Sequence, residues 1–169
     1  MSEWLRLVNE MKRRAPQEYF TPTQRAVYNE LVERLQFPNQ RLNLYGAPGV
    51  GKTYVAWGLV RALDAVHVPV ATRLREFDGR SLPILILDNA PTYEDEVRSL
   101  LADAALIGAE SVLFITHKPT ALRMRQFQLE LPTPDDLKHI ARTLGRLGFY
   151  EVSTPPPSPN LWQLLQCYV

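Results

Sequence analysis

The feature that most constrains this chain is the segment 46–53, which reads GAPGVGKT between a short apolar stretch and a helical pattern. It matches G-x-x-x-x-G-K-[ST], in which glycines let backbone N–H groups wrap phosphates and the next helix offers its positive end. The segment therefore predicts a strand, loop and helix that bind ATP, with Lys52 on the β and γ phosphates and Thr53 on Mg²⁺. The predicted ATP-binding residues are Gly46, Ala47, Pro48, Gly49, Val50, Gly51, Lys52, Thr53 and Tyr54.

Length and charge narrow the remaining possibilities. With 169 residues and 46% hydrophobic content, one compact domain with one core is expected. The 19 Lys and Arg residues nearly balance 18 Asp and Glu residues, so no global field favours nucleic acid or an anionic membrane. The apolar runs are too short to span a bilayer, and a cytoplasmic protein without a membrane partner is expected. Cys167 is the only cysteine, which excludes an internal disulfide and indicates a buried or incidental thiol.

Strand and helix patterns alternate along the chain. This alternation predicts an α/β fold, a three-layer sandwich with a mainly parallel five-stranded sheet. Two helices are expected before the first strand and one after the fifth. The stretch between the second and third strands has room for only a short helix. The expected strands are 41–45, 66–71, 83–88, 111–116 and 126–131, and the expected helices are 2–14, 22–35, 52–63, 92–107 and 133–144.

Helix-start signals and prolines divide the chain into three parts. Thr21 with Gln24 forms a capping-box pattern, and Thr133 before Pro134 opens another helix. The proline-rich stretch 155–159 predicts a stiff extended connector. The expected parts are an N-terminal helix and lead-in at 1–20, a P-loop core at 21–131, and a short, incomplete helical C-terminal lid with a proline-rich tail at 132–169.

A carboxylate follows the apolar run 84–87 at the end of a predicted buried strand. Asp88 is therefore expected to hold Mg²⁺, directly or through water, although an aspartate also caps turns. Asn89 comes next and cannot accept a proton. Hydrolysis would then be slow, or would depend on a partner or on another carboxylate such as Glu94 or Asp95, which serve equally well as partners of the helix dipole.

Two polar positions further along the chain are candidates for sensing the γ-phosphate. Thr116 and His117 end the fourth predicted strand, where a side chain could sense the phosphate or have only a structural role.

Arg123 and Arg125 precede the fifth strand. Arg125 could complete the ATP site of a neighbouring subunit as an arginine finger, or belong to a solvated surface.

These motifs resemble the AAA+ and STAND branches of the ASCE group of P-loop NTPases over roughly residues 17–145. Segment 46–53 resembles Walker A, 84–88 Walker B, and 112–117 the sensor 1 strand. The sequence at 87–89 is similar to STAND ATPases, and that at 123–132 to clamp loaders and origin-binding AAA+ proteins, so both branches stay open. The resemblance implies ATP and Mg²⁺ as cofactors and a lid arginine, for which Arg142 and Arg146 are candidates.

The resemblance and the short C-terminal part together favour a small ATPase subunit of a larger complex. It would convert ATP and water to ADP and phosphate, weakly when alone, and act as a nucleotide-driven switch or assembly component. The alternative is a non-hydrolysing, ATP-gated module that docks on protein or DNA, like a loader or transposition regulator. A small-molecule kinase is a further enzyme class with the same loop. Other protein subunits, including copies of the chain, are the expected partners, and local arginines support DNA only weakly.

Overall fold

The computed structural model describes residues 3–13, 16–76 and 83–168 of the chain. Its centre is a five-stranded sheet in the order β2-β3-β4-β1-β5, with every neighbouring pair parallel. The α/β prediction is confirmed, and the sheet is wholly parallel. The strands are β1 Arg41–Tyr45, β2 Ala65–Val68, β3 Ile84–Leu87, β4 Ser111–Thr116 and β5 Arg125–Gln128. The helices are α1 Glu3–Arg13, α2 Pro22–Leu35, α3 Lys52–Ala62, α4 Glu94–Leu106, α5 Pro134–Arg146 and α6 Leu161–Gln166, with 3-10 turns η1 Pro16–Tyr19 and η2 Ala71–Glu76.

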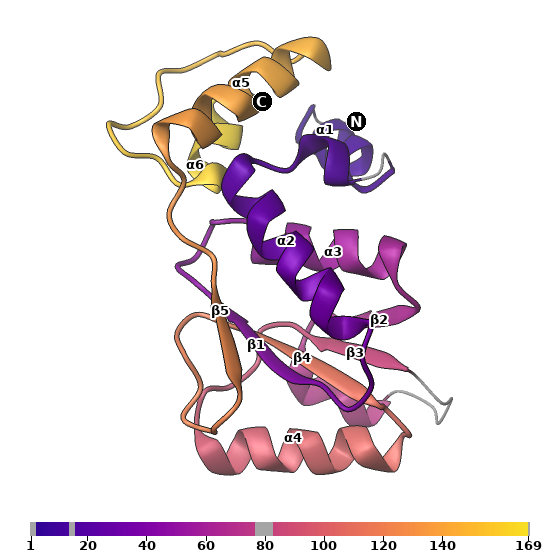
Figure 1. The fold of residues 1–169 in the computed structure, drawn as a ribbon. Helices are drawn as coiled ribbons and strands as arrows, with labels where there is room; N and C mark the ends of the chain where they lie inside the picture. The colour runs from indigo at the N-terminus through magenta and orange to yellow at the C-terminus, as the bar shows by residue number, and fades with distance from the viewer. Residues whose placement is uncertain (1–2, 14–15, 77–82, 169) are drawn as a thin grey trace.

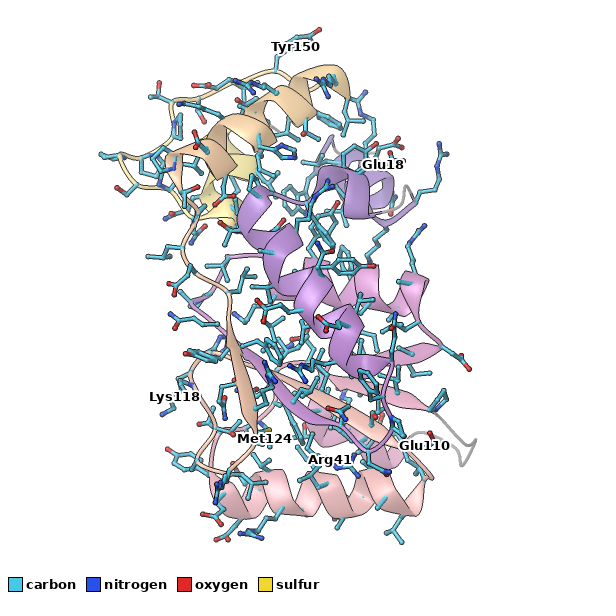
Figure 2. All side chains as sticks on the ribbon, viewed as in Figure 1. Glu18, Arg41, Glu110, Lys118, Met124 and Tyr150 are labelled. Carbon is cyan, nitrogen blue, oxygen red and sulfur yellow. The ribbon has the colours of Figure 1, made fainter. Side chains whose placement is uncertain are left out.

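The sheet lies between two layers of helices (Figure 1), with α2 and α3 on one face and α4 on the other. Every residue of β3 and β4 is buried, as expected for central strands of a parallel sheet covered on both faces. Arg41, the first residue of β1, also contacts the segment before β4, because its guanidinium donates to the Glu110 carbonyl at 2.7 Å (Figure 2). Among the described residues, no helix is long and apolar enough to cross a membrane.

Several element boundaries differ from the sequence predictions. The second strand ends at Val68 rather than residue 71, and the short connecting helix is the 3-10 turn η2. The fifth strand begins one residue earlier than predicted and ends at Gln128. Its length is set by its partner, because β1 is the one described strand with which β5 pairs. The fourth strand is found at the predicted bounds.

The two ends of the chain pack together above the sheet (Figure 1). A third apolar cluster joins Leu7 of α1 to residues of α5, α6 and the segments that follow them, including the buried Cys167. The rings of Trp4 and Trp162 meet edge to face, with centroids 4.6 Å apart. The predicted N-terminal segment and C-terminal lid therefore share one core, while the boundaries proposed at 20 and 131 stay predictions.

The capping boxes at the starts of α2 and α5 are both present, and the second is also a tertiary link. The buried carboxylate of Asp136 accepts from the backbone and hydroxyl of Thr23, at 3.0 and 2.6 Å, and from the backbone and hydroxyl of Thr133, at 2.8 and 2.9 Å. Burial alone would raise the pKa of Asp136. The hydrogen bonds from Thr23 and Thr133 outweigh that effect and hold the pKa below its ordinary value of 3.8.

We expect Asp136→Ala to lower the free energy of unfolding at pH 7 by about 2 kcal/mol, because four donors lose a charged acceptor. A lowered native pKa gives stability that is complete above pH 3.8 and is lost as the pH falls through the native pKa. Urea unfolding at pH 7 and pH 3 measures both effects. The matched control is Asp135→Ala, since Asp135 is exposed and its ion pair with Lys138 is 3.6 Å long. Equal losses in the two variants at pH 7 would contradict the assigned role of Asp136.

Candidate functional site

The loop between β1 and α3 forms a tight turn over the carboxyl end of the sheet. Gly49 and Gly51 have φ angles of 77° and 94°, a region that favours glycine. Lys52 begins α3, and its ammonium donates to the carbonyls of Gly46 and Ala47 at 2.8 and 2.9 Å. Burial lowers the pKa of Lys52, and Asp88 opposes that shift. A cation held over a glycine-rich turn at a helix N-terminus suits an anionic ligand.

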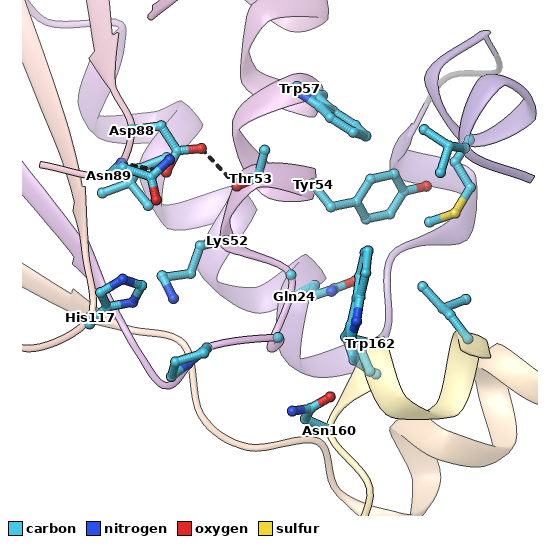
Figure 3. Close-up of a pocket in the computed structure, with 18 of the residues that line it drawn as sticks. Gln24, Lys52, Thr53, Tyr54, Trp57, Asp88, Asn89, His117, Asn160 and Trp162 are labelled. Atoms are coloured by element: carbon cyan, nitrogen blue, oxygen red, sulfur yellow. Dashed lines mark hydrogen bonds between the residues drawn. The ribbon is translucent and has the colours of Figure 1, made fainter. Parts of the chain in front are cut away.

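Asp88 and Thr53 meet at this end of the sheet, as the sequence predicted (Figure 3). The Thr53 hydroxyl donates to Oδ2 of Asp88 at 2.7 Å, and the Asn89 backbone N–H donates to Oδ1 at 2.8 Å. His67 places Nε2 3.2 Å from Oδ2. Burial raises the pKa of Asp88, but hydrogen bonds from His67, Thr53 and Asn89 outweigh it and the net pKa is lowered.

An ionised carboxylate beside a hydroxyl oxygen is a donor pair that a hard cation prefers. Thr53 and Asp88 therefore fit Mg²⁺, because the hydroxyl can give its hydrogen to Asp88 and still offer lone pairs to a cation. His67 was not singled out in the sequence. The sequence places His67 in the strand that precedes the one ending in Asp88 and indicates nothing more. Its contact with Asp88 depends on the register between β2 and β3.

Asn89 has a backbone conformation that limits which residues fit there. Its φ is 51°, in the left-handed region, and its side-chain amide donates to the Pro69 carbonyl at 2.8 Å. Asparagine adopts this conformation more readily than most residues. The left-handed backbone thus gives a physical reason for asparagine at position 89.

We expect Asn89→Val to lower the free energy of unfolding by about 1–2 kcal/mol, because a β-branched residue is strained at positive φ. Asn89→Gly should stay within about 1 kcal/mol of wild type, since glycine adopts this conformation freely but loses the bond to Pro69. Chemical denaturation of the two variants measures the difference. A valine variant as stable as the glycine variant would show that the left-handed backbone imposes no constraint.

The two candidate sensor residues both line the cavity but have different surroundings. Thr116 is buried, and its hydroxyl lies 3.1 Å from Oδ1 of Asn43 and 2.7 Å from the Lys118 carbonyl. Asn43 in turn donates to the Gln126 side chain at 2.7 Å, so Thr116 belongs to a polar network across β4, β1 and β5. His117 lines the cavity beside Lys52 (Figure 3). The sensing roles of Thr116 and His117 stay predictions, and His117 has the ring that faces the ligand space.

The predicted arginines and the alternative acids lie elsewhere. Arg125 is exposed on β5 and lies 5.4 Å above the Phe127 ring, outside the set of residues lining the cavity. Glu94 pairs with Arg98 on the surface of α4. The candidate lid arginines Arg142 and Arg146 are exposed on α5 and also do not line the cavity.

A cavity of about 510 Å³ adjoins the loop and is enclosed by elements from both ends of the chain. At one end lie Lys52, Asp88 and His117, and at the other lie aromatic side chains, of which Figure 3 labels Tyr54, Trp57 and Trp162. Trp4 also lines it, so all three tryptophans of the chain face this space. Linear spacing could not reveal this arrangement, because α1 and α6 reach the loop only through tertiary packing.

The loop itself is held between two polar side chains. Gln24 completes the capping box of α2, as predicted, and its amide also donates to the Val50 carbonyl at 3.2 Å. A Cβ on Gly51 would lie 2.3 Å from that amide, and one on Gly49 would lie 2.8 Å from the Asn160 side chain. The backbone N–H of Trp162 donates to the Gly49 carbonyl at 3.3 Å. The C-terminal segment therefore packs directly on the phosphate-binding loop.

Comparison with known proteins finds solved structures of similar fold, but no match to a protein family or a curated protein. No protein-family model matches the chain, and no curated protein matches it. Similar solved structures include a DNA replication initiation factor (TM-score 0.51, 16% identity), the replication initiator DnaA bound to AMPPCP and single-stranded DNA (0.50, 15%), and AMPPCP-bound DnaA from Aquifex aeolicus (0.52, 13%). They match 73%, 73% and 83% of this chain, which spans only 50%, 50% and 58% of theirs. Together with the parallel sheet and the glycine-rich loop, these matches show that the chain has the fold of an AAA+ P-loop NTPase domain.

Proposed function

We propose that this chain binds ATP with Mg²⁺ and acts as a nucleotide-driven switch or assembly component within a larger complex. The observation that carries the proposal is the meeting of Lys52, Thr53 and Asp88 at one end of the cavity, with Thr53 and Asp88 2.7 Å apart. Lys52 would give its charge to the phosphates in place of the loop carbonyls that it now contacts. Thr53 and Asp88 would hold Mg²⁺, which neutralises phosphate charge when bound.

The aromatic end of the cavity suits the base of the nucleotide. Its volume of about 510 Å³ is within the range of small-molecule sites, and flat rings offer stacking surfaces for a purine. With the phosphates on the glycine-rich loop, the base would lie between α3 and the two terminal helices. Two of the similar solved structures hold the ATP analogue AMPPCP, which supports a nucleotide in this fold.

We expect ATP with Mg²⁺ to change the intrinsic tryptophan fluorescence in a saturable manner, because all three tryptophans line the cavity. Replacing Trp57 by Ala should weaken ATP binding about tenfold, the usual effect of removing an aromatic ring under a base. Fluorescence titration and equilibrium dialysis with labelled ATP measure the two effects. Phe37→Ala is a suitable control, since Phe37 is an exposed aromatic residue outside the cavity. ATP that binds in dialysis with no fluorescence change would place the base elsewhere.

A second candidate function is a non-hydrolysing, ATP-gated docking module. Asp88 is the one carboxylate among the described residues that line the cavity, and Asn89 cannot act as a base. Phosphate release under Mg-ATP, measured alone and with candidate partner proteins, separates the two functions. Turnover that requires a partner supports an ATPase subunit whose base comes from another chain. Tight ATP binding without turnover in every mixture supports the docking module.

The partners belong to the same proposal. Other protein subunits, including copies of this chain, would complete the site from the side of β5, where Arg125 is exposed. DNA is a further candidate, and one similar solved structure is bound to single-stranded DNA. Phosphate contacts release counterions, so affinity for DNA that falls steeply with salt would support this partner. Sedimentation with and without ATP tests self-association.

A further inference from the structure

A histidine outside all the recognised motifs contacts the aspartate of the proposed magnesium site. Nε2 of His67 lies 3.2 Å from Oδ2 of Asp88, and 13% of the His67 side chain is exposed. The pairing of β2 with β3 places it there, because Val68 pairs with Leu87 and the Asp88 N–H donates to the Val68 carbonyl at 2.9 Å. The contact is therefore fixed by the register of two parallel strands.

His67 approaches Asp88 from outside the cavity. It is absent from the described residues that line the cavity, whereas Thr53 and Asp88 belong to them. Among the residues that the structure describes, no group of three or more His, Cys, Asp or Glu side chains is arranged to hold a metal ion. Because it lies outside the cavity that Thr53 and Asp88 line, His67 is placed to support a ligand and not to act as one.

The hydrogen bonds of Asp88 show what this support does. Oδ1 accepts from the Asn89 backbone at 2.8 Å, and Oδ2 accepts from Thr53 at 2.7 Å on the cavity side. Without His67, Thr53 would be the only side chain holding Oδ2 among the contacts described, and Thr53 is itself the second magnesium ligand. A donor outside the cavity fixes the carboxylate independently of the ligand, as outer hydrogen bonds do at other metal sites.

We propose that His67 is a positioning residue whose Nε2–H donates to Asp88 and holds the carboxylate in the orientation that receives Mg²⁺ with the bound nucleotide. This inference rests on the proposed function. A carboxylate that is already oriented need not be reordered when the cation binds, so the support raises the affinity for Mg²⁺. The nucleotide itself does not touch His67, and its affinity without Mg²⁺ should not depend on this side chain.

The first test is a Mg²⁺ titration of ATP binding in wild type, His67→Leu and His67→Gln. Leucine removes the donor, and glutamine restores an N–H at similar reach. We expect the Mg²⁺ concentration for half-maximal binding to rise about 3- to 10-fold in His67→Leu and to stay near wild type in His67→Gln. ATP affinity in EDTA should be the same in all three proteins, and matching melting temperatures show that they are folded. Unchanged Mg²⁺ dependence in His67→Leu, or equal loss in both variants, would overturn the proposal.

The second test reads the hydrogen bond directly, without nucleotide. Long-range ¹H–¹⁵N spectra of protein with labelled histidine report the tautomer of each ring, and the His67 signals are those lost in His67→Gln. A proton on Nε2 supports the proposal, and a neutral ring with its proton on Nδ1 overturns it, because Nε2 could not then donate to Asp88. Absence of ATP binding by the wild type would refute the proposed function, whereas the tautomer decides the His67–Asp88 bond in either case.

Discussion

Lys52→Ala should weaken ATP binding on the order of 100-fold and reduce any phosphate release to background. The Lys52 ammonium is held over the loop by two carbonyls, at 2.8 and 2.9 Å, and a phosphate would exchange those contacts for charge-assisted ones. Two such bonds at about 1.5 kcal/mol each correspond to this loss of affinity. Isothermal titration with ATP and a phosphate-release assay, both with Mg²⁺, measure the effect.

The matched control for Lys52→Ala is Lys138→Ala. Lys138 lies on α5 with 66% of its side chain exposed, pairs weakly with Asp135 and does not line the cavity. The Lys138→Ala protein should bind ATP with the affinity of the wild type. Both variants need comparable melting temperatures, since Lys52 is buried and its removal leaves the carbonyls of Gly46 and Ala47 without that donor. Wild-type ATP affinity in a folded Lys52→Ala protein would refute the assignment of the phosphate site.

The parts of the fold that sequence predicted well are those controlled by local chemistry. The glycine-rich loop, the capping box of Thr21 with Gln24 and the threonine cap at Thr133 are specified by neighbouring residues, and each is found. Asp88 follows a run of buried apolar residues that a central parallel strand requires, so its place at the carboxyl end of the sheet could also be predicted. The proximity of Thr53 and Asp88 then follows from strands that end at the same edge.

The parts that sequence missed depend on contacts between distant segments. The length of β5 follows from pairing with β1, which runs from Leu42 with Arg125 to Tyr45 with Gln128, and apolar residues after Gln128 misleadingly extended the prediction. The contact of His67 with Asp88 depends on the register of β2 against β3. No spacing in the chain indicates either register.

The enclosure of the cavity was also beyond local reasoning. Trp4 lies in the predicted helix 2–14 and Trp162 lies in the tail after the proline-rich stretch, yet their rings meet beside the loop. The short C-terminal segment was expected to leave the lid incomplete. In the structure α1 packs with α5 and α6 in one apolar cluster, and the N-terminal helix thereby supplies part of the cover.

Gly46→Ala should disturb both the fold and the site, because a Cβ at this position has no free space. It would lie 2.4 Å from the Leu129 carbonyl oxygen, closer than Cβ atoms approach other atoms, and 3.3 Å from Cγ2 of Val50. The Leu129 oxygen belongs to the backbone and cannot rotate away, and the Leu129 N–H is bonded to the Tyr45 carbonyl at 2.8 Å. The loop and the segment after β5 must therefore separate.

We expect Gly46→Ala to lower the free energy of unfolding by about 1–3 kcal/mol, the usual range for an overpacked site. The shift should also weaken ATP binding, since the Gly46 carbonyl helps hold Lys52. Gly145→Ala makes the same chemical change in α5, where nothing lies within 4 Å of the added Cβ, and should stabilise the protein by up to about 1 kcal/mol. Urea unfolding and ATP titration of the pair test both effects. Because the two variants differ only in surroundings, equal stability would mean that the loop is not packed against Leu129 as the structure places it.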